Sequence, residues 1–254
     1  MITKRIMELN KIYNEDCLIT MSKMDDDSID LIITSPPYNK AGYEGFIRKR
    51  HGKDSWCNRN VDYQDNPEND FMIESEYQLL QIKVLNEMWR ILKPNGSIFY
   101  NHKVRVAQHK ACHPIEWISK TKLTFRQQII WDRKSSPAVS PIRYLPSTEL
   151  IFWLTKTPCQ PNFSRDRNTE FLGEVWRFSA EQNKLHPAPF PKILPDNIMN
   201  CIKDKEDIVV YDPYCGLGTT CISAKEHGFD YIGSDNSEEY CNIAKQRIED
   251  SPKP

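Results

Sequence analysis

Short apolar runs alternate with segments of helical periodicity along most of this chain of 254 residues. Runs that are rich in aliphatic and β-branched residues predict buried strands. We expect such strands at residues 10–13, 29–34, 97–101, 127–133, 149–155, 207–212 and 229–234. Strands that alternate with helices favour an α/β fold in which helices cover both faces of a mostly parallel sheet.

Helices are predicted at residues 75–92, 192–203 and 236–250. The first has one apolar face, formed by Leu80, Val84, Met88 and Ile91. The sequence Lys93-Pro94-Asn95-Gly96 predicts its end. Asn236 or Ser237 is a suitable N-cap for the last helix.

The strand predicted at 29–34 ends at Ser35-Pro36-Pro37-Tyr38. Two consecutive prolines cannot donate to a sheet ladder and each fixes its φ angle, so the chain must leave the sheet as a stiff, extended loop. This loop presents a hydroxyl, carbonyl groups and an aromatic ring, which suits a planar group that carries an amine, such as a nucleobase. Taken alone, the tetrapeptide is also compatible with an ordinary proline turn.

A second motif follows the strand predicted at 207–212. Asp212-Pro213-Tyr214-Cys215-Gly216-Leu217-Gly218 leads into Thr219-Thr220 and a helical segment. A strand, a glycine-rich turn and a helix form the arrangement that cradles nucleotides, because glycines let the backbone approach a ligand and the helix N-terminus offers unpaired N–H groups. The dinucleotide fingerprint requires Gly or Ala where Cys221 stands, which counts against a dehydrogenase.

Asp235 ends the next predicted strand and is placed to accept hydrogen bonds from ribose hydroxyls. In open α/β sheets, ligands bind outside the carboxyl ends of the strands. We therefore expect Ser35, Asp212 and Asp235 to meet at one crevice, although they are far apart in sequence.

Together, Thr34-Ser35-Pro36-Pro37-Tyr38 and Asp-Pro-x-Cys-Gly-x-Gly-Thr-Thr at 212–220 resemble the catalytic and cofactor motifs of the DNA amino-methyltransferases. The catalytic motif comes first, as in the circularly permuted β class of that family. The resemblance implies a Rossmann-like methyltransferase fold with a seven-stranded sheet, S-adenosyl-L-methionine as cofactor and double-stranded DNA as substrate. We expect a single domain over residues 1–254, with DNA-contacting insertions at 39–73 and 157–185.

Site residues are carried over from the family by their matching motifs. Ser35, Pro36, Pro37 and Tyr38 are the expected catalytic residues. Asp16 is similar to the acidic strand end that contacts the cofactor's adenine amine, and His186 and Phe190 lie in the segment that resembles the one flanking its methionine end. The cofactor-binding residues implied in total are Asp16, Thr34, His186, Phe190, Asp212, Pro213, Cys215, Gly216, Gly218, Thr219, Thr220, Asp235 and Asn236.

Charge is nearly balanced overall, at a net −1, but residues 40–60 hold six basic residues against two acidic ones. Aromatic residues interleave with them, a combination that suits phosphate contact and base stacking. The DNA-binding residues that we expect there are Arg48, Lys49, Arg50, Lys53 and Arg59. A solvated insertion without a DNA role is the alternative.

Composition limits other classes of function. Eight cysteines without a C-x-x-C pair favour reduced thiols and no metal site. The lack of an 18-residue apolar stretch or an N-terminal signal peptide predicts a cytoplasmic protein with no membrane partner. The sequence leaves open whether the chain forms a homodimer and whether a cognate restriction endonuclease accompanies it.

The expected reaction transfers a methyl group to an exocyclic amine. Acceptors for the amine protons, which we expect to be the Ser35 hydroxyl oxygen and the Pro36 carbonyl, would stabilise the positive charge that develops on nitrogen. Tyr38 would stack on a base flipped out of the duplex. The resemblance implies cytosine N4 as the target, because serine at the first motif position is more usual in the family's cytosine enzymes, with adenine N6 as the alternative.

Three further alternatives are a catalytically silent DNA-binding module, an RNA or small-molecule methyltransferase and a C5-cytosine enzyme. The C5 mechanism needs a Pro-Cys nucleophile, and Pro158-Cys159 precedes the glycine turn, whereas that family places it after.

Overall fold

A computed structural model describes residues 7–39, 72–107, 110–134, 144–158, 160–165, 171–180 and 191–252 of the chain. Its main sheet contains the strands β1 (Lys11–Asn14), β2 (Ile29–Thr34), β3 (Leu92–His102), β6 (Thr124–Asp132), β7 (Thr148–Thr155), β8 (Val175–Arg177), β9 (Val209–Asp212) and β10 (Asp230–Asp235). A separate hairpin pairs β4 (Arg105–Ala107) with β5 (Lys110–Cys112). The helices are α1 (Cys17–Ser22), α3 (Glu74–Ile91), α4 (Ile115–Ile118), α5 (Ile193–Asn200), α6 (Thr219–Glu226) and α7 (Glu238–Asp250).

The eight strands of the main sheet lie in the order β1-β10-β9-β2-β3-β7-β6-β8. Neighbouring strands pair in parallel except where β7 pairs antiparallel with both β3 and β6. The predicted α/β class with a mostly parallel sheet is therefore confirmed. All seven predicted strands are present, and the sheet gains an eighth, the three-residue edge strand β8.

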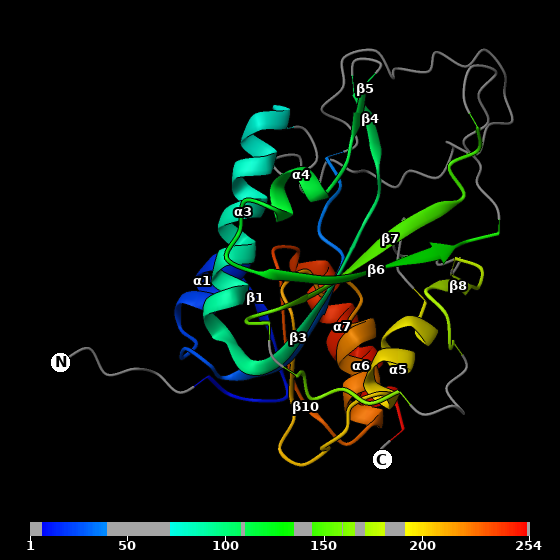
Figure 1. Cartoon of the computed structure of the whole chain (residues 1–254). Coiled ribbons are helices and arrows are strands. Elements are labelled where there is room, and N and C mark those ends of the chain that lie inside the picture. Colours follow the sequence, from blue (N-terminus) through cyan, green and yellow to red (C-terminus); the bar gives the residue numbers. More distant parts are fainter. Residues whose placement is uncertain are drawn as a thin grey trace, which may run out of the picture.

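Helices cover both faces of this sheet (Figure 1). On one face, α1, α3 and α4 pack over a core that includes Ile32 and Ile98, and on the other, α5, α6 and α7 pack over Leu31 and Phe99. Successive residues of β2 and β3 thus face opposite layers, which is the two-residue period of a strand buried on both sides.

Helix α3 begins and ends close to the predicted boundaries, but the four residues after it do not form a separate turn. Lys93-Pro94-Asn95-Gly96 belongs to β3, whose pairing with β2 shifts register between Ile29 and Leu31. This bulge absorbs the proline, because the extra residues leave the ladder there.

The topology gathers several strand ends at one edge of the sheet. The carboxyl ends of the parallel strands β2, β3, β9 and β10 meet there, as the sequence predicts. Since β7 runs antiparallel to β3, with His102 opposite Leu150, the same edge also receives the amino end of β7.

Candidate active site

The loop that follows β2 holds the serine and the tyrosine of the first motif against each other. The Ser35 Oγ lies 2.7 Å from the Tyr38 hydroxyl oxygen. The Asn101 amide nitrogen donates to the Tyr38 oxygen at 2.8 Å, and Tyr38 donates to a carboxylate oxygen of Glu149 at 3.1 Å. The tyrosine side chain is 7 % exposed, with its ring centroid 4.6 Å from that of His102. Stacking of Tyr38 on a base stays a prediction.

Two further contacts fix the backbone of this loop. The Tyr77 hydroxyl donates to the Pro37 carbonyl at 2.7 Å and lies 2.7 Å from His102 Nε2. On the other side of the ring, His102 Nδ1 lies 2.8 Å from the Lys103 backbone nitrogen and 2.9 Å from the Lys103 carbonyl oxygen, so both ring nitrogens have polar partners. The Asn39 side chain, next to Tyr38, forms two hydrogen bonds with the backbone of Met72. Its amide nitrogen donates to the Met72 carbonyl at 2.9 Å, and its amide oxygen accepts from the Met72 N–H at 2.8 Å.

Asp212 joins the first motif to the second. The Thr34 hydroxyl, adjacent to Ser35 in the chain, donates to Asp212 Oδ1 at 2.8 Å. The Thr220 hydroxyl, on the first turn of α6, donates to Asp212 Oδ2 at 2.7 Å, and the Tyr214 N–H donates to Oδ1 at 3.1 Å. The loop at residues 35–38, whose catalytic role is a prediction, and the glycine turn therefore meet at one carboxylate.

The glycine turn adopts the conformation that its sequence requires. Gly216 and Gly218 have φ angles of 47° and 77°, in the left-handed region that favours glycine. The Gly216 N–H donates to Asp235 Oδ2 at 2.9 Å, which links the turn to the end of β10. Strand, turn and helix α6 thus form the unit that the motif predicts.

Two acidic residues stand at the ends of neighbouring strands. Asp235 accepts backbone N–H groups from Gly216 and Ser237, and burial raises the pKa of its carboxyl group. Asp16, just after β1, caps α1 by accepting from the Leu18 N–H at 2.8 Å. Strand β1 pairs with β10 so that Asn14 lies opposite Asp235. The carboxylates lie at the edge where the cofactor contacts are expected.

Burial raises the pKa of the Asp212 carboxyl group from 3.8 to about 6, although the bonds from Thr220, Thr34 and Tyr214 oppose the rise. The native state thus holds this proton more tightly than the unfolded chain, so the associated stability is complete below pH 3.8 and is lost as the pH rises through about 6. The ionised carboxylate then costs the fold about 3 kcal/mol.

Asp212→Asn removes this titration, so we expect the unfolding free energy of the wild type, relative to the variant, to fall as the pH rises from about 4 to about 7. Urea denaturation of both proteins at several pH values measures this difference. The contributions of the titratable groups that the two proteins share cancel in the comparison. Parallel curves for the two proteins would contradict the assignment.

Several predicted site residues lie outside the described part of the chain. These are His186 and Phe190, predicted to bind the cofactor, and Arg48, Lys49, Arg50, Lys53 and Arg59, predicted to contact DNA. Cys159, considered only for the C5 alternative, lies outside the described residues as well. Among the described ones, Pro213, Cys215 and Thr219 are buried beside the turn, and Asn236 is exposed after β10.

Sequence reasoning missed three polar residues beneath the catalytic loop: Asn101 on β3, Glu149 on β7 and Arg133 just after β6. In an open α/β sheet, site residues are expected at the carboxyl ends of parallel strands, whereas Glu149 is the second residue of the antiparallel strand β7. The sequence offered one signal for it, since Glu149 is an acidic residue directly before the apolar run at 150–154.

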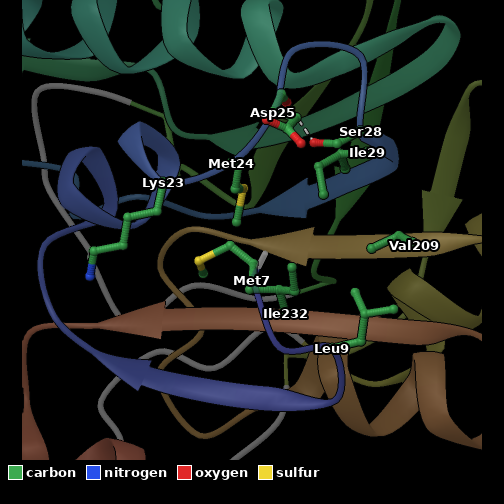
Figure 2. A pocket seen from close by; sticks show the side chains of 9 residues that line it. All are labelled: Met7, Leu9, Lys23, Met24, Asp25, Ser28, Ile29, Val209 and Ile232. Atoms are coloured by element: carbon green, nitrogen blue, oxygen red, sulfur yellow. Dashed lines mark hydrogen bonds between the residues drawn. The ribbon is translucent and has the colours of Figure 1, made fainter. Parts of the chain in front are cut away.

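A surface pocket lies at the other end of the same strands (Figure 2). Its lining includes Ile29 and Val209, which begin β2 and β9, and Lys23 and Met24 from the segment before β2. The catalytic loop follows the last residue of β2, about 17 Å away at the usual rise per residue. This pocket is separate from the site described above.

Within the described ranges, no helix has the length and apolar character needed to span a membrane. The same residues contain no group of three or more His, Cys, Asp or Glu side chains placed to hold a metal ion.

Comparison with known proteins identifies the family. The model of the N6/N4 DNA methylase family matches residues 29–246. The type II methyltransferase M.BglII of Bacillus subtilis is 26 % identical over 278 residues, which cover 96 % of this chain and 70 % of that protein.

Two solved structures share the fold. The PvuII DNA methyltransferase (cytosine-N4-specific) has a TM-score of 0.68 at 19 % identity, covering 94 % of this chain and 89 % of that one. A putative DNA modification methylase from Thermus thermophilus, complexed with S-adenosyl-L-methionine, has a TM-score of 0.62 at 20 % identity, covering 94 % of each chain. With its catalytic motif ahead of its glycine turn, in the order of the β class, the chain belongs to the N6/N4 DNA methylase family.

Proposed function

We propose that this protein transfers a methyl group from S-adenosyl-L-methionine to the exocyclic amine of a base in double-stranded DNA, with cytosine N4 as the target. The observation that carries this proposal is the Thr34–Asp212–Thr220 contact, which holds the amine-binding loop and the cofactor-type turn side by side. Methyl transfer needs its two reactants at one place, because positioning supplies much of the acceleration.

The residues around the glycine turn suit a nucleoside cofactor. The turn has two glycines that allow close approach of a ligand, and it leads into the N-terminus of α6. Asp235 and Asp16 supply carboxylates for ribose hydroxyls and an adenine amine. When bound, S-adenosyl-L-methionine supplies an electrophilic methyl group on a positively charged sulfur.

The catalytic loop supplies the other half of the reaction. An exocyclic amine is a poor nucleophile, since its lone pair is delocalised into the ring. The Ser35 oxygen accepts an amine proton, which favours a pyramidal nitrogen and stabilises the positive charge that develops there. The Pro36 carbonyl is the second acceptor: within the described residues no side chain donates a hydrogen bond to it, whereas the Pro37 carbonyl is bound to Tyr77.

Serine at the first motif position supports cytosine N4, because that residue is more usual in the cytosine enzymes that the motif resembles. Adenine N6 is the second candidate, because the family includes both kinds of amino-methyltransferase and a serine oxygen can accept from either amine.

Nucleoside mass spectrometry of plasmid DNA from cells that express the chain tests both targets. N4-methylcytosine, absent from DNA of cells that express Ser35→Ala, is the expected product. Detection of N6-methyladenine would support methyl transfer to an exocyclic amine but would make adenine, and not cytosine, the target base. 5-Methylcytosine, or no modified base at all, would contradict the proposed function.

A further inference from the structure

A buried polar cluster lies directly beneath Ser35 and Tyr38. Glu149 is 8 % exposed and Asn101 is 2 % exposed. The Asn101 amide nitrogen lies 3.1 Å from Glu149 Oε2, and Arg133 pairs with Glu149 Oε1 at 3.2 Å. Three strands, β3, β6 and β7, contribute to the cluster, so its members come together only in the folded sheet.

The protons in this cluster can be assigned by counting donors. A carboxylate has no proton to give, so the single Tyr38 hydroxyl proton goes to Glu149 Oε2. The Tyr38 oxygen must then accept from Ser35 across their 2.7 Å contact. Ser35 therefore donates to Tyr38, and its oxygen accepts a long contact from the Asn101 amide nitrogen at 3.4 Å, which leaves one lone pair for an outside donor.

Two other observations indicate that the cluster has a role toward a ligand in addition to stabilising the fold. Within the described residues, the Asn101 side-chain oxygen is buried without a hydrogen-bond partner. A buried acceptor without a partner destabilises the protein, and a ligand with N–H groups would supply that partner. Burial and the charge of Glu149 raise the pKa of Tyr38 well above its usual range, so its hydroxyl stays protonated and able to donate.

We infer that Glu149 is a positioning residue for methyl transfer and the terminal acceptor of the proton that the methylated amine must lose, acting through the chain Ser35–Tyr38–Glu149. The inference rests on the proposed function and deepens it. Negative charge at Glu149 polarises both hydroxyls, so the Ser35 oxygen becomes a better acceptor as positive charge grows on the amine nitrogen.

The proton step balances within these residues. After methylation, the amine nitrogen carries one excess proton and a positive charge. That proton passes to the Ser35 oxygen, the Ser35 proton passes to the Tyr38 oxygen, and the Tyr38 proton passes to Glu149 Oε2. The base leaves neutral, both hydroxyls are regenerated, and Glu149 becomes a carboxylic acid that must release one proton to solvent before the next turnover.

The groups that face Glu149 come from each element around it. Arg133 after β6 is the cation that pairs with its carboxylate, Tyr38 approaches from the catalytic loop, and Asn101 approaches from β3 as a neutral amide. His102 packs against the Tyr38 ring, with the ring centroids 4.6 Å apart.

Glu149→Gln keeps the shape and an oxygen acceptor for Tyr38 but removes the charge. We expect a single-turnover rate of methyl transfer at least about tenfold lower, with unchanged dissociation constants for DNA and cofactor. This effect is below the roughly 10²–10⁴-fold typical of direct proton-transfer groups, since two hydroxyls intervene. Formate should partly restore the rate of Glu149→Ala, because it returns a carboxylate to the cavity that the truncation leaves.

Asp30→Asn is the matched control, because Asp30 is also a partly buried carboxylate paired with a cation, Lys93, but lies near the opposite end of β2. Its single-turnover rate should match that of the wild type. A Glu149→Gln rate within about twofold of wild type, or a loss explained entirely by weaker binding, would overturn the role of Glu149. If the wild type itself methylates no DNA, the proposed function fails, and the inference fails with it. If the wild type methylates DNA and Glu149→Gln keeps its rate, only the role of Glu149 fails.

Discussion

Alanine in place of Ser35 should lower the rate of methyl transfer by about 10²–10³-fold, the usual cost of one hydrogen-bond acceptor or donor that acts on charge developing in a transition state. The variant loses the oxygen that we propose to accept the amine proton and the first link of the chain to Glu149. Thr34, Asp212 and the glycine turn keep their contacts, so the affinity for cofactor should persist. Single-turnover transfer of a radiolabelled methyl group, with calorimetry for cofactor binding, measures the two effects separately.

Ser28→Ala is the control for Ser35→Ala. Ser28 lies just before β2, and its hydroxyl donates to the Asp25 carbonyl at 2.7 Å (Figure 2). Its removal should leave the methyl-transfer rate unchanged. If Ser35→Ala retains wild-type transfer, Ser35 has no part in the mechanism. Transfer of label by the wild type would also exclude a catalytically silent binding module.

The sequence predicted the framework of the site because local patterns determine it. A diproline after an apolar run must end a strand, and a glycine turn between a strand and a helix is a local unit. The rule that ligands bind at the carboxyl ends of strands brought Ser35, Asp212 and Asp235 to one edge. The contacts between Thr34 and Asp212, and between Gly216 and Asp235, are the geometry that this rule anticipates.

The support beneath the catalytic loop depends on pairings that no local pattern specifies. Glu149 reaches the site because β7 runs antiparallel to β3. The sequence of an apolar run does not specify whether the strand pairs parallel or antiparallel with its neighbour. Asn101 lies opposite Ile151 in that pairing, and Arg133 arrives through the pairing of β6 with β7. The short strand β8 was missed for a related reason, since three residues are too few to establish a periodicity.

The same pairings also explain the conformation of Tyr38. From the sequence alone, a tyrosine after two prolines is an exposed aromatic ring available for stacking. In the structure, Asn101 and Glu149 bind its hydroxyl group and His102 packs against its ring. The ring is thereby held in one orientation, a preorganisation that reduces the entropy lost when a base arrives.

Gly218 is the position in the cofactor turn where backbone and packing both require glycine. Its φ angle of 77° costs a residue with a side chain about 1–2 kcal/mol. An added Cβ would lie 3.0 Å from the Ala244 Cβ on α7, closer than ordinary van der Waals contact. Because α6 begins at the next residue, movement of this turn would also shift the helix N-terminus that we propose to face the cofactor.

Gly218→Ala should therefore lower the free energy of unfolding by about 2–4 kcal/mol, the sum of backbone strain and of overpacking against α7. Cofactor affinity should fall as well, because strain relieved by moving the turn would misplace its N–H groups. Gly173→Ala is the matched control, since its Cβ would approach only the Val175 nitrogen, at 4.0 Å, and its effect should stay within about 0.5 kcal/mol. Urea denaturation of both variants, with calorimetric titration of cofactor, measures these effects. If Gly218→Ala were as stable as Gly173→Ala and bound cofactor normally, the turn would tolerate a side chain, and its role as the cofactor cradle would have to be abandoned.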